Sequence, residues 1–363
     1  MIHIFVGTKA QLIKMAPIMQ ELDRRVVAYN FIDSGQHAGL MRDLLDEFEL
    51  RAPDVCLRAQ PTSIATLGQA LLWATRHLGR ASLRRGRVFQ EVFSGERGVC
   101  LIHGDTLTTL VSLVCAKRCG IKVAHVEAGL RSRHWLDPFP EEIIRSIAMW
   151  GSDLLFAPSD WAAENLQKMG YGAKTVAVGG NTVMDAIRFA RQSGPACSWG
   201  RGQYAVASIH RVETIYSPRR LVLVTRIVER IAREFEMVFV THEPTGRQLR
   251  RLGLADRLSK MDGVRVVPLQ PYLSFLNLLA GAEFVVADGG SIQEECYYLG
   301  VPCLILRKET ERMEGLGENA VLCGFAESEI ERFLATYSAL RRRPIADMAS
   351  PSRTIVEHLL RWA

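Results

Sequence analysis

Three carboxylic acids lie at positions in the sequence that folding could bring together in one site. Asp105 follows the apolar run 99–102 at a strand-to-helix turn, and Glu127 closely follows a second predicted strand, 122–125. Glu141 lies in the first turn of a predicted helix. Side chains at the carboxyl ends of parallel strands face the crevice in which open α/β sheets bind ligands, so we expect Asp105 and Glu127 to share a cleft that Glu141 can reach. Three carboxylates in one partly dry site predict acid/base chemistry.

Two of these acids also have an ordinary structural interpretation. Asp105 could cap the helix that follows it, and Glu141 could be a first-turn glutamate that the helix dipole favours. On these two residues alone both interpretations stay open. The presence of His103 and His125 at the same strand ends favours a functional site.

The second half of the chain carries groups suited to a phosphorylated ligand. His210 and Arg211 follow a predicted strand, 204–208, where they would favour a phosphate. Gly289-Gly290-Ser291 leads from strand 284–287 into a helix whose first amides lack partners and attract phosphate; a plain tight turn is the alternative. Glu295, one turn into that helix, is placed to accept hydrogen bonds from a ribose diol.

Three further groups have weaker support from the pattern. The first predicted strand, 2–6, ends at Gly7, and one glycine turn is a weak sign of an anion site. Lys14, on the helix that follows, could contact an anion, although the residue alone favours a solvated helix lysine. Arg312 lies on a loop after the last strand and is placed to close over the cleft.

Strands alternate with helices along the whole chain, which predicts parallel sheets. At 363 residues the chain exceeds one ordinary core, so we expect two α/β, doubly wound domains. A long arginine-bearing helix is predicted over 62–85 and a connector over 86–98.

Composition excludes several classes of protein. With 48% hydrophobic and 23% charged residues the chain is globular. The net charge of +6 is modest and the basic residues do not alternate with aromatic ones, so we expect no nucleic acid binding. The eight cysteines lie mostly in apolar runs without zinc-ligand spacing, which predicts no metal and reduced thiols in the cytoplasm. We also expect neither a signal peptide nor membrane insertion.

Motifs in order along the chain resemble those of the UDP-N-acetylglucosamine 2-epimerases. They are His103-Gly-Asp-Thr106, His125-Val-Glu-Ala-Gly-Leu-Arg131, Pro140-Glu-Glu142 with Arg145, Gly180-Asn-Thr-Val-Met-Asp185, His210-Arg-x-Glu213, Gly290-x-Ile-Gln-Glu-Glu295 and Thr310-Glu-Arg312. The resemblance implies the GT-B fold, two Rossmann-like domains with a cleft between them. The expected domains are 1–180, onto which 350–363 packs back with a last helix over 355–363, and a UDP-binding domain over 181–349.

The resemblance also implies the reaction, epimerisation at carbon 2 of UDP-N-acetylglucosamine or a related UDP-2-acetamido sugar by elimination and re-addition of UDP. It implies no cofactor, UDP-sugar and UDP as partners, and a homodimer serving polysaccharide biosynthesis. The residues carried over as catalytic are Asp105, Glu127, Glu141 and His210. Those carried over as substrate-binding are Lys9, Lys14, Arg145, Arg211, Gly290, Ser291, Glu295 and Arg312.

The chain departs from the family pattern at two places. Lys9 replaces an arginine that would contact the nucleotide, and lysine cannot form the bidentate pair. The usual Ser-Gly-Gly turn is reordered to Gly289-Gly290-Ser291. Both departures bear on the identity of the substrate. Two alternatives remain: a hydrolysing 2-epimerase that releases UDP and free N-acetylmannosamine, and a GT-B glycosyltransferase that uses a UDP-sugar donor.

Overall fold

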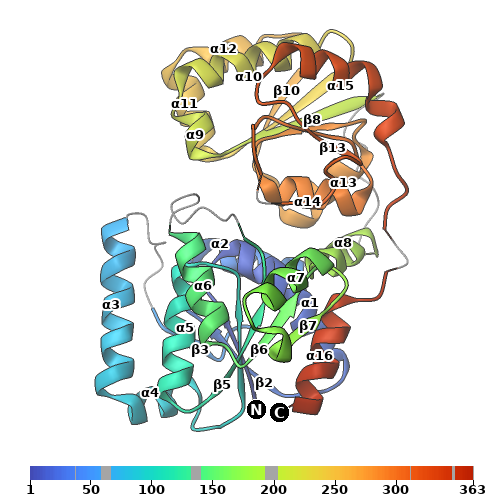
Figure 1. The fold of residues 1–363 in the computed structure, drawn as a ribbon. Coiled ribbons are helices and arrows are strands. Elements are labelled where there is room, and N and C mark those ends of the chain that lie inside the picture. The colour runs from blue at the N-terminus through green and yellow to red at the C-terminus, as the bar shows by residue number, and fades with distance from the viewer. Residues whose placement is uncertain are drawn as a thin grey trace. The chain divides into compact units, whose positions relative to one another are not determined.

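The computed structural model describes residues 1–36, 38–58, 67–131, 140–192, 203–310, 312–345 and 348–362. The chain forms two compact units, Met1–Ala186 with Met348–Ala363, and Ile187–Asp347 (Figure 1). The boundary follows Ala186, later than the expected one after residue 180. Helix α8 (Val183–Gln192) crosses it, and the start of α8 is tied to the end of the chain by bonds from Ser350 and Ser352 to Asp185, both 2.9 Å.

The first unit is built on a seven-stranded sheet in the order β3-β2-β1-β4-β5-β6-β7, in which every pairing is parallel. The strands are β1 (Ile2–Val6), β2 (Tyr29–Asp33), β3 (Val55–Cys56), β4 (Val99–His103), β5 (Lys122–Val126), β6 (Leu154–Ala157) and β7 (Thr175–Ala177). The order reverses between β1 and β4, which makes the ends of these strands the switch point where such sheets bind ligands.

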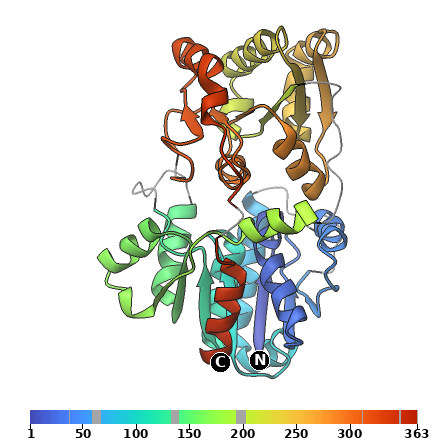
Figure 2. The same cartoon turned by 90° about the vertical axis from the view of Figure 1, so that its right-hand side faces the viewer.

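Helices cover both faces of this sheet. Figures 1 and 2 show α1 and α16 side by side on one face, with α3 and α5 on the other. The helices are α1 (Lys9–Arg24), α2 (Ala38–Glu47), α3 (Leu67–Leu83), α4 (Arg85–Val92), α5 (Leu107–Arg118), α6 (Glu141–Gly151), α7 (Asp160–Lys168), the short η1 (Gly172–Lys174), the start of α8, and α16 (Pro351–Trp362).

Two predictions about these helices are wrong. The predicted connector 86–98 contains α4, because Val88 and Val92, one helical turn apart, are both buried and Gly86 does not interrupt the helix. The last helix starts at Pro351, four residues before the predicted start, since proline is well tolerated in a first helical turn.

The second unit repeats the architecture with a six-stranded parallel sheet in the order β10-β9-β8-β11-β12-β13. Its strands are β8 (Tyr204–Ile209), β9 (Glu236–Thr241), β10 (Val264–Pro268), β11 (Val285–Ala287), β12 (Cys303–Ile305) and β13 (Ala320–Leu322). Its helices are α9 (Val212–Ile215), α10 (Pro218–Ile231), α11 (Glu243–Arg251), α12 (Leu254–Ser259), α13 (Tyr272–Gly281), α14 (Gly290–Leu299) and α15 (Glu327–Leu340). The switch point lies between β8 and β11.

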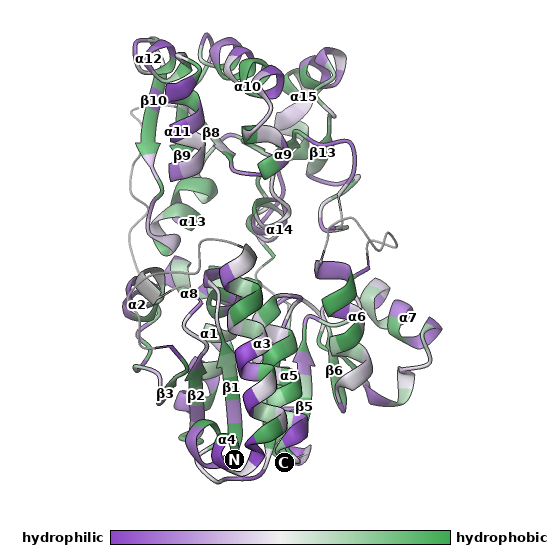
Figure 3. Cartoon of the chain, turned by 90° about the vertical axis from the view of Figure 1, so that its left-hand side faces the viewer, coloured by the Kyte–Doolittle hydropathy of each residue, from purple (hydrophilic) through white to green (hydrophobic). Residues whose placement is uncertain are grey.

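Burial explains why these segments form strands and helices. The inner strands β1, β4, β8 and β11 are buried along their whole length, as expected when helices cover both faces of a parallel sheet. Figure 3 shows hydrophobic and hydrophilic stretches alternating along α3, α6 and α10, typical of helices with one face toward a core. The predicted fold class, two Rossmann-like doubly wound domains, is confirmed. In the described part of the chain no helix has the length and apolarity to cross a membrane.

Candidate active site

The carboxylates of the first unit lie at its switch point. Asp105 comes two residues after β4, and Glu127 directly follows β5. A Cβ atom built on Gly104 would lie 3.7 Å from Glu127 Oε2, which places the Glu127 carboxylate over the turn that carries Asp105. Thr106, not Asp105, caps helix α5, since its side chain accepts from the backbone of Thr109. The structure therefore brings Asp105 and Glu127 together and leaves the side chain of Asp105 free of a capping role.

Glu127 has a strained backbone and a carboxylate held from two directions. Its φ angle is +66°, in the left-handed region that costs a non-glycine residue about 1–3 kcal/mol. Lys14 and Asn181 both donate to Oε1, Asn181 at 2.6 Å, while His103 Nε2 lies 3.4 Å from Oε2. Lys14 and Glu127 have side chains only 8% exposed, so Lys14 is not the solvated lysine that its helix position favoured. Strain at such a residue persists only where the surroundings fix it, and it clusters at functional sites.

Asp105 belongs to a chain of four alternating charges. Arg145 donates from Nη2 to Asp105 Oδ2 and from Nη1 to Glu142 Oε2, the latter at 2.8 Å. Arg131 Nε binds the other oxygen of Glu142. Both Arg145 and Glu142 are buried. The resemblance implied a substrate-binding role for Arg145, whose guanidinium here donates to two carboxylates of its own unit.

Glu141 is the third carboxylate, and it opens helix α6. Its Oε2 atom is buried and has no hydrogen-bond partner in the described part of the chain. A buried oxygen without a partner costs about 1–3 kcal/mol. The ion pair between Arg145 of α6 and Asp105 holds the start of this helix next to the Asp105 turn.

Two buried side chains support the loops that carry these acids. His125 Nε2 lies 2.8 Å from the carbonyl oxygen of Gly104, and burial lowers the pKa of His125 to about 4, so the ring is neutral and donates this bond. Gln11 accepts from the amides of Gly7 and Thr8 at 3.0 and 3.2 Å and donates to the carbonyl of His103 at 2.8 Å. These bonds tie the β1 and β4 turns together, and Lys9 opens helix α1 directly after the first of them.

In the second unit, Asp288 organises the turn after β8. It is completely buried and accepts from the backbone amides of His210 and Arg211, both at 3.0 Å. His210 Nδ1 lies 3.7 Å from Asp288 Oδ1, and the His210 ring packs 4.8 Å from that of His242. Burial lowers the pKa of His210 below its ordinary value; the charge of Asp288 opposes this and that of Arg211 adds to it. Asp288 was not among the predicted site residues, although it directly follows a buried strand, β11, as Glu127 follows β5.

The start of helix α14 lies against His210. A Cβ atom on Gly289 would come within 2.5 Å of His210 Cε1, so only glycine allows this approach. The N-cap residue of the helix, Gly289, has no side chain to cap it, and the first turn from Gly290 holds no acidic residue, which favours an anion at the amide N–H groups. Ser291 is exposed beside them, and buried Glu295 accepts a 2.9 Å bond from the hydroxyl of Tyr272.

The two arginines of this unit that were predicted to bind substrate form ion pairs with nearby glutamates. Arg211 Nε lies 2.7 Å from Glu213, and Arg312 Nη1 lies 3.2 Å from the buried Glu294. Gln293 also binds the carbonyl oxygen of Arg312, at 3.1 Å. The predicted loop thus lies along α14, held by Gln293 and Glu294, two residues that sequence analysis included in a motif without assigning them a role.

Two Rossmann-like units, one with acid/base carboxylates and one with a helix start open to an anion, define an enzyme that acts on a phosphorylated substrate. The model of the UDP-N-acetylglucosamine 2-epimerase family matches residues 20–353, and the chain belongs to this family. This confirms the family that the motifs suggested.

Individual relatives agree over almost the full length. The chain is 32% identical over 373 residues to the UDP-N-acetylglucosamine 2-epimerase of Bacillus subtilis, covering 98% of this chain and 93% of the relative. The crystal structure of Methanocaldococcus jannaschii UDP-GlcNAc 2-epimerase in complex with UDP-GlcNAc and UDP has a TM-score of 0.83 at 27% identity and 99% coverage of both chains. The Neisseria meningitidis enzyme bound to UDP-GlcNAc gives 0.83 at 26% identity, again with 99% of both chains covered.

Proposed function

We propose that this chain interconverts UDP-N-acetylglucosamine, or a related UDP-2-acetamido sugar, and its 2-epimer. The observations that carry the proposal are that Asp105 and Glu127 meet at the switch point of the first unit, and that Glu141 opens the helix whose Arg145 binds Asp105. Abstraction of a weakly acidic carbon-bound proton requires such positioned bases. The structures of relatives bound to UDP-GlcNAc support the choice of substrate.

The proposed reaction is an elimination followed by an addition. A carboxylate takes the proton from carbon 2, the electron pair of that bond forms the carbon 1–carbon 2 double bond, and the bond from carbon 1 to oxygen breaks with its electrons on UDP. UDP then returns to carbon 1 while a proton is added to the opposite face of carbon 2. No step requires a metal or an organic cofactor.

The roles of the residues follow from their contacts. Asp105, Glu127 and Glu141 move protons at carbon 2. Lys14 and Arg145 act mainly by holding Glu127 and Asp105. His210 stabilises the departing diphosphate, and the other members of the nucleotide site are Lys9, Arg211, Gly290, Ser291, Glu295 and Arg312.

Proton NMR of the products from UDP-N-acetylglucosamine in deuterated water tests the proposal. We expect the UDP-linked manno epimer, with deuterium at carbon 2. Free N-acetylmannosamine with UDP would instead identify a hydrolysing enzyme. Product without solvent label would contradict proton abstraction, and no product at all would contradict the reaction.

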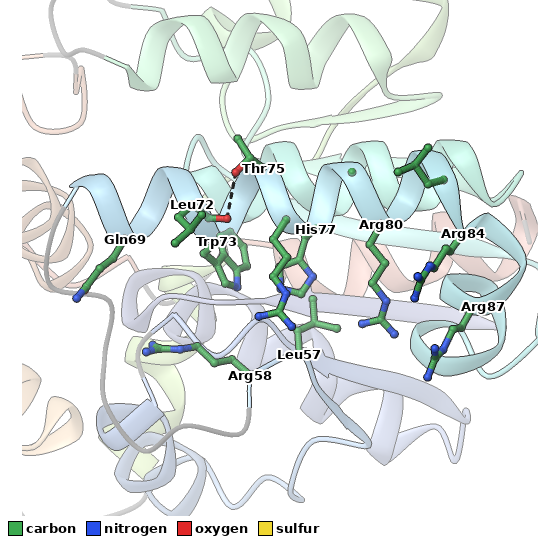
Figure 4. A pocket seen from close by; sticks show the side chains of 13 residues that line it. Leu57, Arg58, Gln69, Leu72, Trp73, Thr75, His77, Arg80, Arg84 and Arg87 are labelled. Atoms are coloured by element: carbon green, nitrogen blue, oxygen red, sulfur yellow. Dashed lines mark hydrogen bonds between the residues drawn. The ribbon is translucent and has the colours of Figure 1, made fainter.

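We further propose that two copies associate through a groove on the first unit. The groove, of about 990 Å³, is lined by Leu57, Arg58, Gln69, Leu72, Trp73, Thr75, Arg76, His77, Gly79, Arg80, Leu83, Arg84 and Arg87 (Figure 4). Leu72 and Leu83 are 71% and 86% exposed, and exposed apolar groups with Arg and Trp are typical of interfaces. Glu91 pairs with Arg80 and Arg87, which limits repulsion between like surfaces.

Light scattering after size exclusion tests this association. Leu72→Asp with Leu83→Asp should convert a dimer into a monomer, whereas Leu360→Asp, at a 43% exposed site on α16, should not. A monomeric wild type, or a dimer that survives the double change, would contradict the proposed surface.

A cytoplasmic location is also proposed. The described part of the chain contains seven cysteines, all of them free thiols, and five of these are buried. Free thiols are typical of reducing compartments. Cell fractionation that places the protein outside the cytoplasm would contradict this.

A further inference from the structure

Glu142, which has no assigned role, lies at the centre of the charge network behind Asp105. Its side chain is 0% exposed and lies between two arginines. Oε1 accepts from Arg131 and Oε2 accepts from Arg145 at 2.8 Å. Arg145 in turn binds Asp105. A carboxylate buried with an arginine on each oxygen is firmly oriented, because moving it would strand a buried charge.

The backbone around Glu142 is equally fixed. The residue lies in the first turn of α6, where the helix dipole stabilises a carboxylate. Ser146 donates to the carbonyl oxygen of Glu142 at 2.9 Å, and Arg145 lies three residues along on the same face of the helix. Glu142 and Arg145 therefore form one rigid element.

The consequence for Asp105 comes from the shape of the guanidinium. Arg145 presents Nη1 to Glu142 and Nη2 to Asp105, so its planar fork is held at both tips. Asp105 is one-quarter exposed, and Arg145 is the side chain that binds it within the described ranges. Arg145 occupies Oδ2 and leaves Oδ1 for another ligand. If Glu142 did not hold Nη1, Arg145 could rotate, and the Oδ1 atom would lose its fixed position.

We infer that Glu142 is a positioning residue that acts through Arg145 to hold the catalytic carboxylate of Asp105. The inference rests on the proposed epimerase function, because it requires Asp105 to exchange a proton with the sugar. A small displacement of a proton-transferring group lowers the rate of the chemical step more than the binding of substrate. Loss of the Glu142 charge should therefore lower kcat and leave KM nearly unchanged.

A double-mutant cycle separates positioning from a general structural role. The variants are Glu142→Gln, Asp105→Asn and the combination of the two. If Glu142 works through Asp105, its replacement has little further effect once Asp105 can no longer exchange a proton. A structural defect would lower the rate by the same factor in both backgrounds. The slow Asp105→Asn reactions are followed by NMR as deuterium entry at carbon 2 over long incubations.

The matched control is Glu21→Gln. Glu21 also binds two arginines of the first unit, Arg24 at 2.7 Å and Arg25 at 2.6 Å, but it lies on α1 outside the network. We expect Glu142→Gln to lower kcat at least about tenfold with KM within about twofold, and Glu21→Gln to change neither. In the Asp105→Asn background, Glu142→Gln should cost less than about twofold.

Several results of the cycle would contradict the proposed role of Glu142. Equal factors in both backgrounds, an unchanged kcat in Glu142→Gln, or a loss confined to KM would refute the positioning role. If Glu142→Gln does not fold, Arg145→Lys, which keeps the charge but cannot bridge both carboxylates, takes its place in the same cycle with the same criteria. An inactive wild type refutes the proposed function itself, whereas an active wild type with an additive cycle refutes the positioning role alone.

Discussion

Replacing Lys14 by methionine tests how firmly the Glu127 carboxylate is held. The change keeps most of the side-chain volume and removes the ammonium group from a pair whose members are both 8% exposed. Removing one partner of a buried ion pair costs about 3–5 kcal/mol, because the other charge stays buried. Asn181 still donates to the same oxygen at 2.6 Å. Because this bond keeps the carboxylate partly satisfied, we expect a loss at the lower end of that range, about 3 kcal/mol.

Scanning calorimetry measures this loss. For a folding unit of about 150–250 residues, 1 kcal/mol corresponds to about 2–4 °C in Tm, so Lys14→Met should lower one transition by about 6–12 °C. The control is Lys117→Met, which breaks the 2.7 Å pair with Asp153 between side chains 40% and 36% exposed. Exposed pairs contribute about 0–1 kcal/mol, so the control should change Tm by only a few degrees.

The double variant Lys14→Met/Glu127→Gln decides the physical cause. A neutral amide at position 127 can still accept from Asn181 and leaves no stranded charge. We expect the double variant to be more stable than Lys14→Met alone, as when both partners of a buried pair are removed. If the double variant is no more stable than the single one, or if Lys14→Met costs no more than Lys117→Met, the buried-charge argument is wrong.

Three further predictions concern other parts of the two sites. Glu141→Gln should lower the epimerisation rate by a factor on the order of 10²–10⁴, as loss of an acid/base group does. Its Tm should stay unchanged, because Oε2 has no protein partner in the described ranges. An NMR rate assay and calorimetry measure the two quantities, and a normal rate would exclude an acid/base role. Gly289→Ala should weaken UDP binding at least about tenfold, because the added methyl group would lie 2.5 Å from the His210 ring, so that either His210 or the turn must move. Wild-type affinity in titration calorimetry would show that UDP binding does not depend on the close contact between Gly289 and His210. Burial lowers the pKa of His125 to about 4, so between about pH 6.5 and 4 the unfolded chain binds a proton that the folded chain does not, and the free energy of unfolding falls by about 3 kcal/mol as pH falls. In denaturant titrations, His125→Asn should show a shallower dependence of stability on pH. An unchanged slope would refute this.

The strand ends were predictable, since they depend on local patterns. Asp105, Glu127 and His210 each follow an apolar run of strand length, and the rule that ligands bind at the carboxyl ends of parallel strands places them correctly. The glycine turn before α14 was likewise predictable, because a glycine pair between a buried strand and a helix is typical of a turn that exposes backbone amides.

The partners of these residues were not predictable, because each contact joins distant segments. Lys14 lies 113 residues from Glu127, and Asn181 lies 54 residues from it. Whether a helical lysine faces water or a buried acid depends on which strand end lies opposite, and no local period contains that information. Arg145 shows the same limit: the resemblance implied a contact with the substrate, and the pairing with Asp105, 40 residues away, was not visible in the sequence.

The two units differ in how their charges are compensated, and this difference bears on how the reaction can be divided. In the first unit Lys14, Arg131 and Arg145 are paired with Glu127, Glu142 and Asp105, which leaves the Glu141 oxygen without a partner in the described part of the chain. A diphosphate would be stabilised little there, because Lys14, Arg131 and Arg145 already form ion pairs and Glu141 would repel it. In the second unit Asp288 is saturated by two backbone amides, and the start of α14 has no acidic residue. For the proposed reaction we therefore expect the groups that stabilise UDP to belong to the second unit and the groups that transfer the proton to belong to the first.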